Sequence, residues 1–400
     1  MTSRPVHPTR LRRPPDTVVG RSALLAGSRA GFEGEAATDL VRAAAALGSH
    51  AGPTAVTGSG HVHATADGLD AIAFRRRIAA HPPIFARNAI VGTGPHAIAS
   101  EDQRTRADRM PPLLAAIDDL ARDPAQAPPW CGVWVEYPDT NDGKALTKLA
   151  RVLQSRLASA LGDAGRIDAN ADCRLHVFLR DGRTAWIGTS AAMATRWPLG
   201  IPRLRRDGRA PSRSAQKLAE AIVVFLGERE GDLLHGGQRA VDLGAAPGGW
   251  TWVLASRGLQ VVAVDNGPLK GDVPHDPRVR HLRADGLTWR PPRPVDWLVC
   301  DIVERPVRIA EVVAGWIADG DAQAAIFNLK LPMKQRYDEV RRCEALIAER
   351  LRTAGVRATL ELRHLYHDRE EVTGCILPEY HAKGGAGVPG PQAAHGGRPV

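Results

Sequence analysis

The sequence predicts an α/β protein whose C-terminal half is a Rossmann-like domain, a doubly wound parallel sheet with helices on both faces. Four short apolar runs alternate with helix-like segments there, which is typical of strands buried on both faces. The runs lie at residues 240–243, 261–264, 297–300 and 324–329. A glycine-rich turn follows the first run, and Asp265 lies roughly 20 residues beyond Gly244, where nucleotide-binding α/β folds place the acid that holds a ribose.

The length and composition of the chain predict two or three domains and a nucleic-acid partner. The 400 residues are 44% apolar, which is enough to bury at least two cores. Lys and Arg outnumber Asp and Glu by 53 to 44, and much of the net charge of +9 comes from arginine, which suits phosphate contacts. Arginine also occurs along the whole chain, so a merely arginine-rich composition remains an alternative explanation.

Cysteine usage and the N-terminus exclude several classes of protein. The five cysteines are odd in number, widely spaced and without a Cys-x-x-Cys pair, so we expect neither a disulfide framework nor a zinc site. His61 and His63 alternate on one predicted strand without a third ligand nearby, and no metal site is predicted. No apolar signal region and no run of roughly 18 apolar residues is found. We therefore expect a cytoplasmic enzyme without membrane contact.

Two α+β units are predicted before the Rossmann-like domain. Residues 1–17 and 380–400 are rich in Pro, Gly, Arg and Ala, and we expect mobile tails there. An N-terminal α+β domain is predicted at 18–95, and a second unit at 96–195. The first unit should have strands at 18–26 and 61–66 and helices at 31–47 and 69–80. The second should have helices at 113–121 and 145–161, a strand at 133–137 and a hairpin at 175–179 and 184–188.

A basic linker is predicted at residues 196–214, before a domain at 215–379. Arginines crowd this Pro- and Gly-broken stretch, and Asp207 is its single acid. Such a stretch beside a ligand-binding domain suits the phosphate backbone of RNA, because cationic side chains displace condensed counterions there. A solvated connector is the alternative.

The ends of the predicted strands supply the candidate ligand-binding residues. The loop after the first strand has the form D-x-G-x-x-P-G-G, which differs from the G-x-G-x-x-G of a pyrophosphate cradle. A ligand with a ribose and no pyrophosphate fits better, and S-adenosylmethionine is the commonest. Asp265 would hold the ribose hydroxyls and Asp285 would lie near the adenine amino group. The backbone of Ala246, Pro247, Gly248 and Gly249 would face the methionine end.

Four charged residues, three of them at or near strand ends, are candidates for the chemistry: Lys217, Asp301, Lys330 and Glu371. Methyl transfer to a ribose 2′-hydroxyl benefits from a base that takes the proton and from cations that hold the developing alkoxide. A lysine can serve as the base only if its pKa falls from about 10.4 towards roughly 7 to 8, and we expect the two lysines to depress each other. The two carboxylates would orient the amines and oppose that depression.

Competing chemistries lack their motifs at the same strand ends. An exocyclic-amine methyltransferase usually shows Asn/Asp-Pro-Pro-aromatic after the fourth strand, whereas this chain has Asp301-Ile302-Val303. A cytosine C5 enzyme needs a Pro-Cys nucleophile, but Cys300 lies within a predicted strand. A ribose hydroxyl therefore remains the favoured acceptor.

Several motifs of the chain occur together in one known family. They lie at 242–250, 264–268, 300–301, 327–334 and 365–372. In these motifs the chain closely resembles the RlmM-type large-subunit ribosomal RNA cytidine 2′-O-methyltransferases. The resemblance extends upstream through 200–204 and 210–214, and more loosely to 138–141 and 31–33, and so covers about residues 18–377. Ala246 stands where the family motif has Cys, which is harmless in a loop that acts through its backbone.

The resemblance implies a Rossmann-like methyltransferase domain behind a ferredoxin-like unit and a THUMP-containing RNA-binding region at 96–195. It places Ser214, the 246–249 loop, Asp265, Asp285 and Asp301 on cofactor positions and Lys330 on the proton-acceptor position. Together Lys217, Asp301, Lys330 and Glu371 resemble the Lys-Asp-Lys-Glu tetrad of related ribose methyltransferases, with Glu370 as an alternative last member.

The implied substrate is a cytidine of 23S ribosomal RNA, free or in an early precursor of the large subunit. No DNA partner is expected, and a monomer is favoured although the sequence leaves the oligomeric state open. Another RNA nucleotide as acceptor, in ribosomal RNA or tRNA, is an alternative. So is a non-catalytic RNA-binding assembly factor with a vestigial cofactor site.

Overall fold

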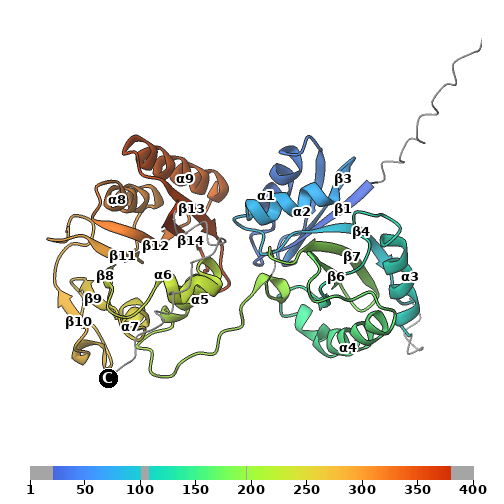
Figure 1. Cartoon of the computed structure of the whole chain (residues 1–400), viewed down its shortest axis with the longest axis horizontal. Helices are drawn as coiled ribbons and strands as arrows, with labels where there is room; N and C mark the ends of the chain where they lie inside the picture. The colour runs from blue at the N-terminus through green and yellow to red at the C-terminus, as the bar shows by residue number, and fades with distance from the viewer. Residues whose placement is uncertain (1–20, 101–107, 195, 380–400) are drawn as a thin grey trace, which may run out of the picture.

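The computed structural model describes residues 21–100, 108–194 and 196–379, which form two lobes around two seven-stranded sheets (Figure 1). The tails predicted at 1–17 and 380–400 lie outside the described residues. Residues 192–214 join the lobes, and the described part of this segment contains no long helix or strand. Within the described ranges, no helix combines the length and apolar character needed to cross a membrane.

The N-terminal lobe contains one mixed sheet with strand order β2-β3-β1-β4-β7-β6-β5. Its strands are β1 (Arg21–Gly27), β2 (Ala51–Ala55), β3 (His61–Asp67), β4 (Ile90–Ala97), β5 (Val133–Glu136), β6 (Cys173–Leu179) and β7 (Thr184–Ala191). Its helices are α1 (Glu33–Ala45), α2 (Ala71–Ala80), α3 (Met110–Leu120), the short η1 (Gly143–Leu146) and α4 (Thr147–Asp163). The predicted hairpin is confirmed, because β6 and β7 pair antiparallel.

The four long helices cover the same face of this sheet. Leu24 and Val91 are paired across β1 and β4 and pack with α1 and α2. Further along the same face, Val177 and Ile187 pack with α3 and α4. The opposite face carries Leu25, Ile90, Phe178 and Trp186, and residues 199–201 of the connecting segment pack against it. The first half of the connecting segment thus belongs to the core of the N-terminal lobe.

Strands β2 and β4 were not predicted, and β4 changes how the lobe is built. It pairs with β1 on one side and β7 on the other, so the two predicted α+β units share one sheet, and the proposed boundary at 95/96 falls inside β4. The signal was weak because β4 contains Gly92, Gly94 and Pro95, and β2 contains Gly52 and Pro53. A side chain at Gly92 would lie 2.0 Å from the Ile187 carbonyl oxygen, so close strand approach requires glycine there.

The C-terminal lobe has strand order β10-β9-β8-β11-β12-β14-β13. Its strands are β8 (Arg239–Leu243), β9 (Gln260–Val264), β10 (Val279–Leu282), β11 (Val295–Cys300), β12 (Ala322–Lys330), β13 (Ala358–Arg363) and β14 (Glu371–Pro378). Its helices are α5 (Ala215–Phe225), α6 (Glu230–Leu233), α7 (Gly249–Ala255), α8 (Pro306–Ala318) and α9 (Arg336–Thr353), with the 3-10 turns η3 (Gly227–Arg229) and η4 (Val273–His275). A further 3-10 turn, η2 (Pro198–Gly200), lies in the connecting segment.

The Rossmann-like architecture is confirmed, with one addition at the edge. Strands β10, β9, β8, β11 and β12 are parallel, whereas β14 runs antiparallel to its two neighbours, β12 and β13, and was not predicted to do so. Helices α8 and α9 pack on one face, and α5 to α7 contribute to a separate core on the other. Strands β12 and β14 keep an unbroken register through Gly374, which lies opposite Phe327. An added Cβ there would meet the Phe327 ring at 2.3 Å.

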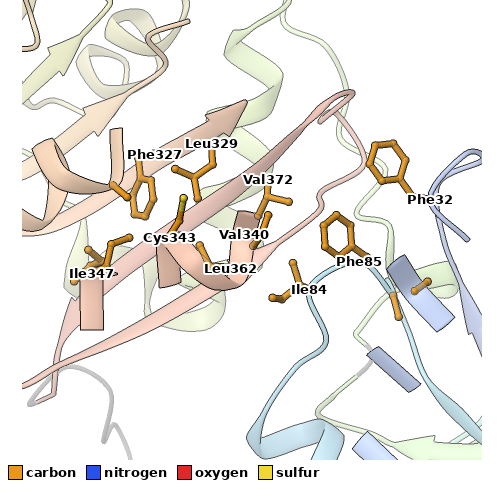
Figure 2. Packing of buried hydrophobic residues seen from close by; sticks show 14 of the residues in the cluster. Phe32, Ile84, Phe85, Phe327, Leu329, Val340, Cys343, Ile347, Leu362 and Val372 are labelled. Carbon is orange, nitrogen blue, oxygen red and sulfur yellow. The ribbon is translucent and has the colours of Figure 1, made fainter. Parts of the chain in front are cut away.

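The two lobes share a buried hydrophobic cluster, in which Phe32, Ile84 and Phe85 of the N-terminal lobe occur together with Leu362 and Val372 of the C-terminal lobe (Figure 2). Phe32 and Phe85 of the N-terminal lobe pack around His364, with ring centroids at 4.2 and 5.7 Å. The backbone N–H of His364 donates to the Ile84 carbonyl at 2.7 Å. This contact ties the turn between β13 and β14 to the N-terminal lobe.

Candidate active site

The antiparallel pairing of β12 with β14 builds one side of the candidate active site. Lys330 lies directly opposite Glu371, and Asn328 lies opposite Thr373. Side chains two residues apart on a strand point to the same face, so all four side chains share one face of the strand pair. The register of two strands therefore determines which acid meets Lys330.

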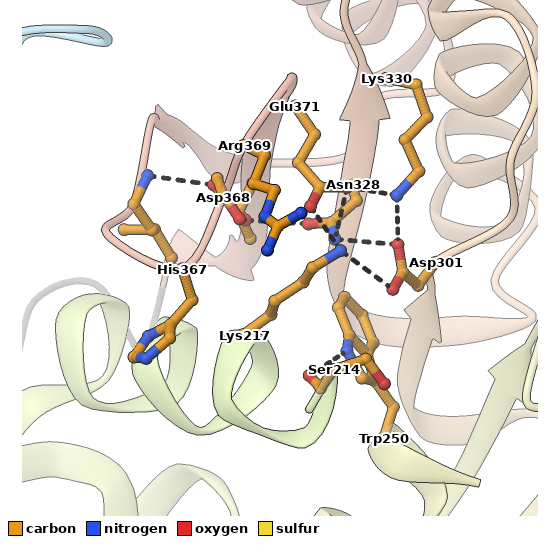
Figure 3. A network of polar contacts seen from close by, with 12 residues as sticks. Ser214, Lys217, Trp250, Asp301, Asn328, Lys330, His367, Asp368, Arg369 and Glu371 are labelled. Atoms are coloured by element: carbon orange, nitrogen blue, oxygen red, sulfur yellow. Dashed lines mark hydrogen bonds and ion pairs between the residues drawn. The ribbon is translucent and has the colours of Figure 1, made fainter. Parts of the chain in front are cut away.

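Four charged side chains meet at this place (Figure 3). Lys330 Nζ donates to Asp301 Oδ1 at 2.6 Å and also to Glu371. Lys217 Nζ, from the first turn of α5, forms an ion pair with Glu371 and lies 3.5 Å from Asp301 Oδ2. Each amine thus contacts both carboxylates. The lysine side chains are 19% and 22% exposed, so solvent or a substrate can reach them.

The carboxylates govern the protonation of Lys330. Burial by itself lowers the pKa of Lys330, but the charges of Asp301 and Glu371 and their hydrogen bonds raise it above its ordinary value. The expectation that the two lysines depress each other's pKa is therefore wrong for Lys330 in this arrangement. The physical reason is contact: the Lys330 amine has two carboxylates beside it, and these favour its charged form.

Glu371 is the glutamate that joins the cluster. Its side chain is buried at the start of β14 and faces both lysines. Glu370 is instead largely exposed and lies 3.8 Å from Arg336. A shift of one residue along a strand turns the side chain to the other face, which separates these two neighbours.

Asn328 and Thr373 belong to the site, although neither residue was predicted from the sequence. Asn328 Nδ2 donates to Asp301 Oδ1 at 3.0 Å and to Glu371 Oε2 at 3.5 Å. Thr373 Oγ1 donates to Asn328 Oδ1 at 2.8 Å. Both side chains are completely buried. The available signal was an amide in an otherwise apolar run, two residues before Lys330 and hence on its face.

The glycine-rich loop after β8 packs tightly against its neighbours. Gly244 and Gly248 have φ values of 79° and 108°, which favour glycine. A Cβ on Gly249 would lie 2.4 Å from the hydroxyls of Ser212 and Ser214. Ser214 in turn accepts a hydrogen bond from Trp250 Nε1 through its carbonyl at 3.1 Å. The loop and the start of α5 therefore form one unit, which brings Ser214 beside residues 246–249.

The acids after β9 and β10 lie around the same loop. Asp265 accepts hydrogen bonds from the backbone N–H groups of Ala246 at 2.9 Å and Gly267 at 2.7 Å. Asp285 is exposed and accepts from the Leu287 N–H at 2.9 Å, so it also caps its own turn. A Cβ placed on Gly286, the residue that follows Asp285, would lie 3.7 Å from the backbone nitrogen of Gly244. Both predicted acids are thus next to the loop predicted to hold the cofactor.

Asp242 supplies an observation that fits a polar ligand at this loop. Its carboxyl is buried in β8, where Oδ2 accepts from Thr251 Oγ1 at 2.6 Å. Oδ1 is buried and has no hydrogen-bond partner among the described residues. Burial raises the pKa of Asp242 to about 7. A loop with an unsatisfied acceptor, close-packed glycines and two further acids suits the amino-acid and ribose groups of S-adenosylmethionine.

A groove of about 1030 Å³ runs from the charged cluster to the N-terminal lobe. Lys217, Glu371 and Ser214 line one end, and the loop at 139–142 lines the other. Most of the charged residues along it are basic, namely Arg29, Arg87, Lys144, Arg203, Arg213, Lys217 and Arg369. This composition suits a polyanion that extends from the N-terminal lobe to the cluster.

Tyr366 and Asp139 contact the same two arginines of the groove. The guanidinium groups of Arg87 and Arg203 lie 5.4 and 5.2 Å from the centre of the Tyr366 ring. The same two arginines form ion pairs with Asp139 at 3.2 and 3.3 Å. The loop containing Asp139 therefore contacts the connecting segment and faces the groove.

The chain is similar to known methyltransferases over most of its length. Residues 210–343 match the FtsJ-like methyltransferase family, and residues 108–191 match the N-terminal region of ribosomal RNA large subunit methyltransferase M. The relative of that name from Thauera aminoaromatica is 43% identical over 367 residues, covering 90% of this chain and 98% of the relative. The one from Methylococcus capsulatus is 44% identical over 358 residues, covering 89% and 98%.

Proposed function

Since the chain belongs to the ribosomal RNA large subunit methyltransferase M family, we propose that it transfers a methyl group from S-adenosylmethionine to the ribose 2′-hydroxyl of a cytidine in 23S ribosomal RNA. The observation that carries this proposal is the cluster of two lysines and two carboxylates at the end of a basic groove. A hydroxyl acceptor needs a base and a cation, and the cluster offers both.

Lys330 is the proposed general base, and Lys217 the proposed cation that holds the developing alkoxide. With both amines protonated, the two lysines and two carboxylates sum to zero charge. When Lys330 gives up its proton, the cluster has a net charge of −1, and Asp301 and Glu371 still hold both amines in place. Lys330 then accepts the 2′-hydroxyl proton as the ribose oxygen forms its new bond.

S-adenosylmethionine supplies a methyl group on a positively charged sulfur. Asp265 would hold the ribose hydroxyls of the cofactor, and Asp285 would lie near its adenine. The backbone of residues 246–249, with Ser214 and Asp301 beside it, would hold the methionine end. The negative charge of the cluster, once Lys330 is neutral, complements a cationic donor.

We assign RNA binding to the N-terminal lobe and the connecting segment, with a THUMP-like unit at residues 96–195. Arg213 is exposed beside the cluster, and Arg203 reaches from the connecting segment to Asp139 of the N-terminal lobe. A groove with cationic groups from both lobes can hold the RNA on both sides of the target nucleotide. Free 23S RNA and an early large-subunit precursor are both candidate substrates, and a monomer and a cytoplasmic location remain predictions.

The proposal is tested by labelling purified 23S RNA and an early precursor particle with radioactive S-adenosylmethionine. Ribose-methylated positions are then mapped by mass spectrometry of nuclease fragments. We expect one 2′-O-methylcytidine, absent with a Lys330→Ala variant that still binds the cofactor. Methylation of another nucleotide or of tRNA would mean that this RNA, and not the proposed cytidine, is the substrate. RNA binding without cofactor binding or methyl transfer would instead indicate an assembly factor.

A further inference from the structure

A chain of buried hydrogen bonds leads from the charged cluster into the protein, beyond the residues that the proposed reaction uses. It begins at Asn328, whose amide nitrogen contacts both Asp301 and Glu371. It continues through Thr373, whose hydroxyl lies 2.8 Å from Asn328 Oδ1. It ends at Asp368, whose two carboxyl oxygens lie 3.1 and 2.9 Å from that hydroxyl. Asn328, Thr373 and Asp368 are each 0% exposed.

The donors and acceptors of this chain admit one consistent direction. Ionised Asp301 and Glu371 only accept hydrogen bonds, so the amide nitrogen of Asn328 must face them and its oxygen must face Thr373. The single hydroxyl proton of Thr373 is then needed by Asn328. Asp368 can satisfy Thr373 only by donating a proton to it, because one hydroxyl cannot donate to both neighbours.

We propose that Asp368 carries a proton in the resting enzyme and, through Thr373 and Asn328, positions the Asp301 and Glu371 carboxylates against the two lysines. Asp368 is a positioning residue, since it touches neither the lysines nor the groove. The role in turnover rests on the proposed methyl-transfer function. The protonation itself is a property of the folded chain and can be measured without turnover.

The surroundings of Asp368 favour the neutral form. Its Oδ2 accepts from the Leu365 N–H at 3.0 Å, which leaves Oδ1 to carry the proton towards Thr373. The charged groups that face it are Glu371 on β14 and Glu220 on α5, and both are acidic. Burial first, and then the charge of Glu371, raises the pKa of Asp368 to about 8.

Loss of this proton has a defined structural consequence. An ionised Asp368 accepts the Thr373 proton, and Asn328 Oδ1 is left buried without a donor. The amide is then free to rotate, and its hydrogen bonds to Asp301 and Glu371 are no longer held. The catalytic rate should therefore fall at high pH for a reason separate from Lys330, whose loss of a proton favours the reaction.

The central experiment replaces Asp368 with Asn, which has the same shape and a permanent donor. The carbonyl of the new amide can accept from Leu365 and its nitrogen can donate to Thr373, so Asp368→Asn should retain kcat within about threefold at neutral pH. Asp301→Asn is the matched control in the same cluster, and it should lose at least about a hundredfold, because Asp301 must be an ionised acceptor. An Asp368→Asn variant that loses tenfold or more overturns the proposal.

Variants of Thr373 separate the hydrogen-bond chain from packing. Thr373→Val keeps the volume and removes the hydroxyl, and kcat should fall by about tenfold with an unchanged KM for S-adenosylmethionine. Thr373→Ser restores the hydroxyl and should restore most of the rate. A rate that is retained in the Val variant and lost in the Ser variant would mean that the methyl group, and hence packing, is what matters.

The pH dependence provides the decisive readout. The kcat of the wild-type protein should decline above about pH 8, and in Asp368→Asn this decline should disappear. Superimposable profiles for the two proteins, or a decline retained in the variant, overturn the proposed coupling.

Thermal unfolding tests the protonation independently of activity. A raised pKa means that the native state holds the proton to higher pH than the unfolded chain, so this group makes stability fall as the pH rises from about 4 to about 8. The melting temperature of Asp368→Asn should fall less over that range than that of the wild type. If the protein methylates no RNA, the proposed function fails while this measurement still decides the state of Asp368. If the melting temperatures of the two proteins change equally over this pH range, Asp368 is ionised in the native state.

Discussion

Each lobe contains a cluster of charged and polar side chains on its central sheet, and the two clusters differ in access. In the N-terminal lobe, His176 Nδ1 donates to Glu136 Oε2 at 2.6 Å, and His176 Nε2 lies 2.8 Å from Ser190 Oγ. These side chains are at most 1% exposed. In the C-terminal lobe, the lysines of the charged cluster are about one-fifth exposed and face a groove.

The difference in access separates a structural cluster from a chemical one. The other oxygen of Glu136 accepts the N–H of Leu199, so the N-terminal cluster holds the connecting segment against the sheet. Its Ser-His-Glu composition resembles a nucleophilic triad, but no substrate can reach a fully buried serine. The cluster around Lys330 has the same kind of ion pairs, but it lies where a ligand can enter. Residue types therefore suggest chemistry only when a site is accessible.

The largest effect is expected at Lys330. Replacing it with Ala should lower kcat by about a thousandfold, or roughly 4 kcal/mol of activation free energy, because the base is lost. Lys330→Arg should lose as much, since arginine keeps the charge and cannot serve as a base. Single-turnover methyl transfer measures the rate, and exposed Lys334→Ala is the control. A residual rate within tenfold of wild type would contradict the assignment of the base.

A stability effect is expected instead at His176. His176→Ala leaves Glu136 buried without its partner and should lower the free energy of unfolding by roughly 3 kcal/mol. Urea denaturation measures this change, with exposed His50→Ala as the control. The kcat of the remaining folded protein should stay at the wild-type value at low temperature. A selective loss of kcat without loss of stability would remove the contrast between the two clusters.

A smaller effect, on RNA binding, is expected at Arg213, where the groove meets the charged cluster around Lys330. Arg213→Ala should weaken RNA binding about fivefold and reduce the slope of log affinity against log salt by about 1, because one phosphate contact is lost. Filter binding at several salt concentrations measures both quantities. Arg122→Ala is the control, because this arginine is 80% exposed and lies outside the groove. Equal effects of the two variants would mean that only total charge matters.

The smallest effect is expected at Ser190. Ser190→Ala removes one buried hydrogen bond to His176 and should lower the free energy of unfolding by about 1 kcal/mol. Exposed Ser159→Ala should change it by less than about 0.5 kcal/mol. Methyl transfer should be unaffected in both. A loss of methyl transfer with Ser190→Ala would mean that the buried cluster of Glu136, His176 and Ser190 takes part in the reaction.

Four of the seven C-terminal strands, β8, β9, β11 and β12, could be predicted from the sequence because their signals are local. Buried parallel strands appear as apolar runs, and Gly244 and Asp265 follow two of those runs directly. The four charged residues of the cluster were selected for the same reason, three of them lying at or near strand ends. Their roles in catalysis remain proposals, but their meeting in space is an observed feature of the fold.

The remaining features depended on contacts between distant segments. Glycine and proline concealed β4, which only its pairing with β1 and β7 makes a strand. Asn328 could not be linked to Thr373 before the register of β12 and β14 was known. The direction of the Lys330 pKa shift also depended on how closely the carboxylates approach the amine.

The sequence by itself determined the Rossmann-like domain, the glycine-rich loop and the charged residues available at the strand ends. Each of these features depends on residues that are close together in the chain. There, apolar runs, the alternation of strand-like and helix-like segments, and turn residues determine the local backbone conformation. The tertiary structure decided that Glu371 and not Glu370 meets Lys330. It also decided that Asn328 and Thr373 connect the cluster to Asp368. Finally, it decided that Glu136 is buried away from solvent. Strand register and burial arise from packing between distant segments, and a shift of one residue would exchange every inward side chain for an outward one.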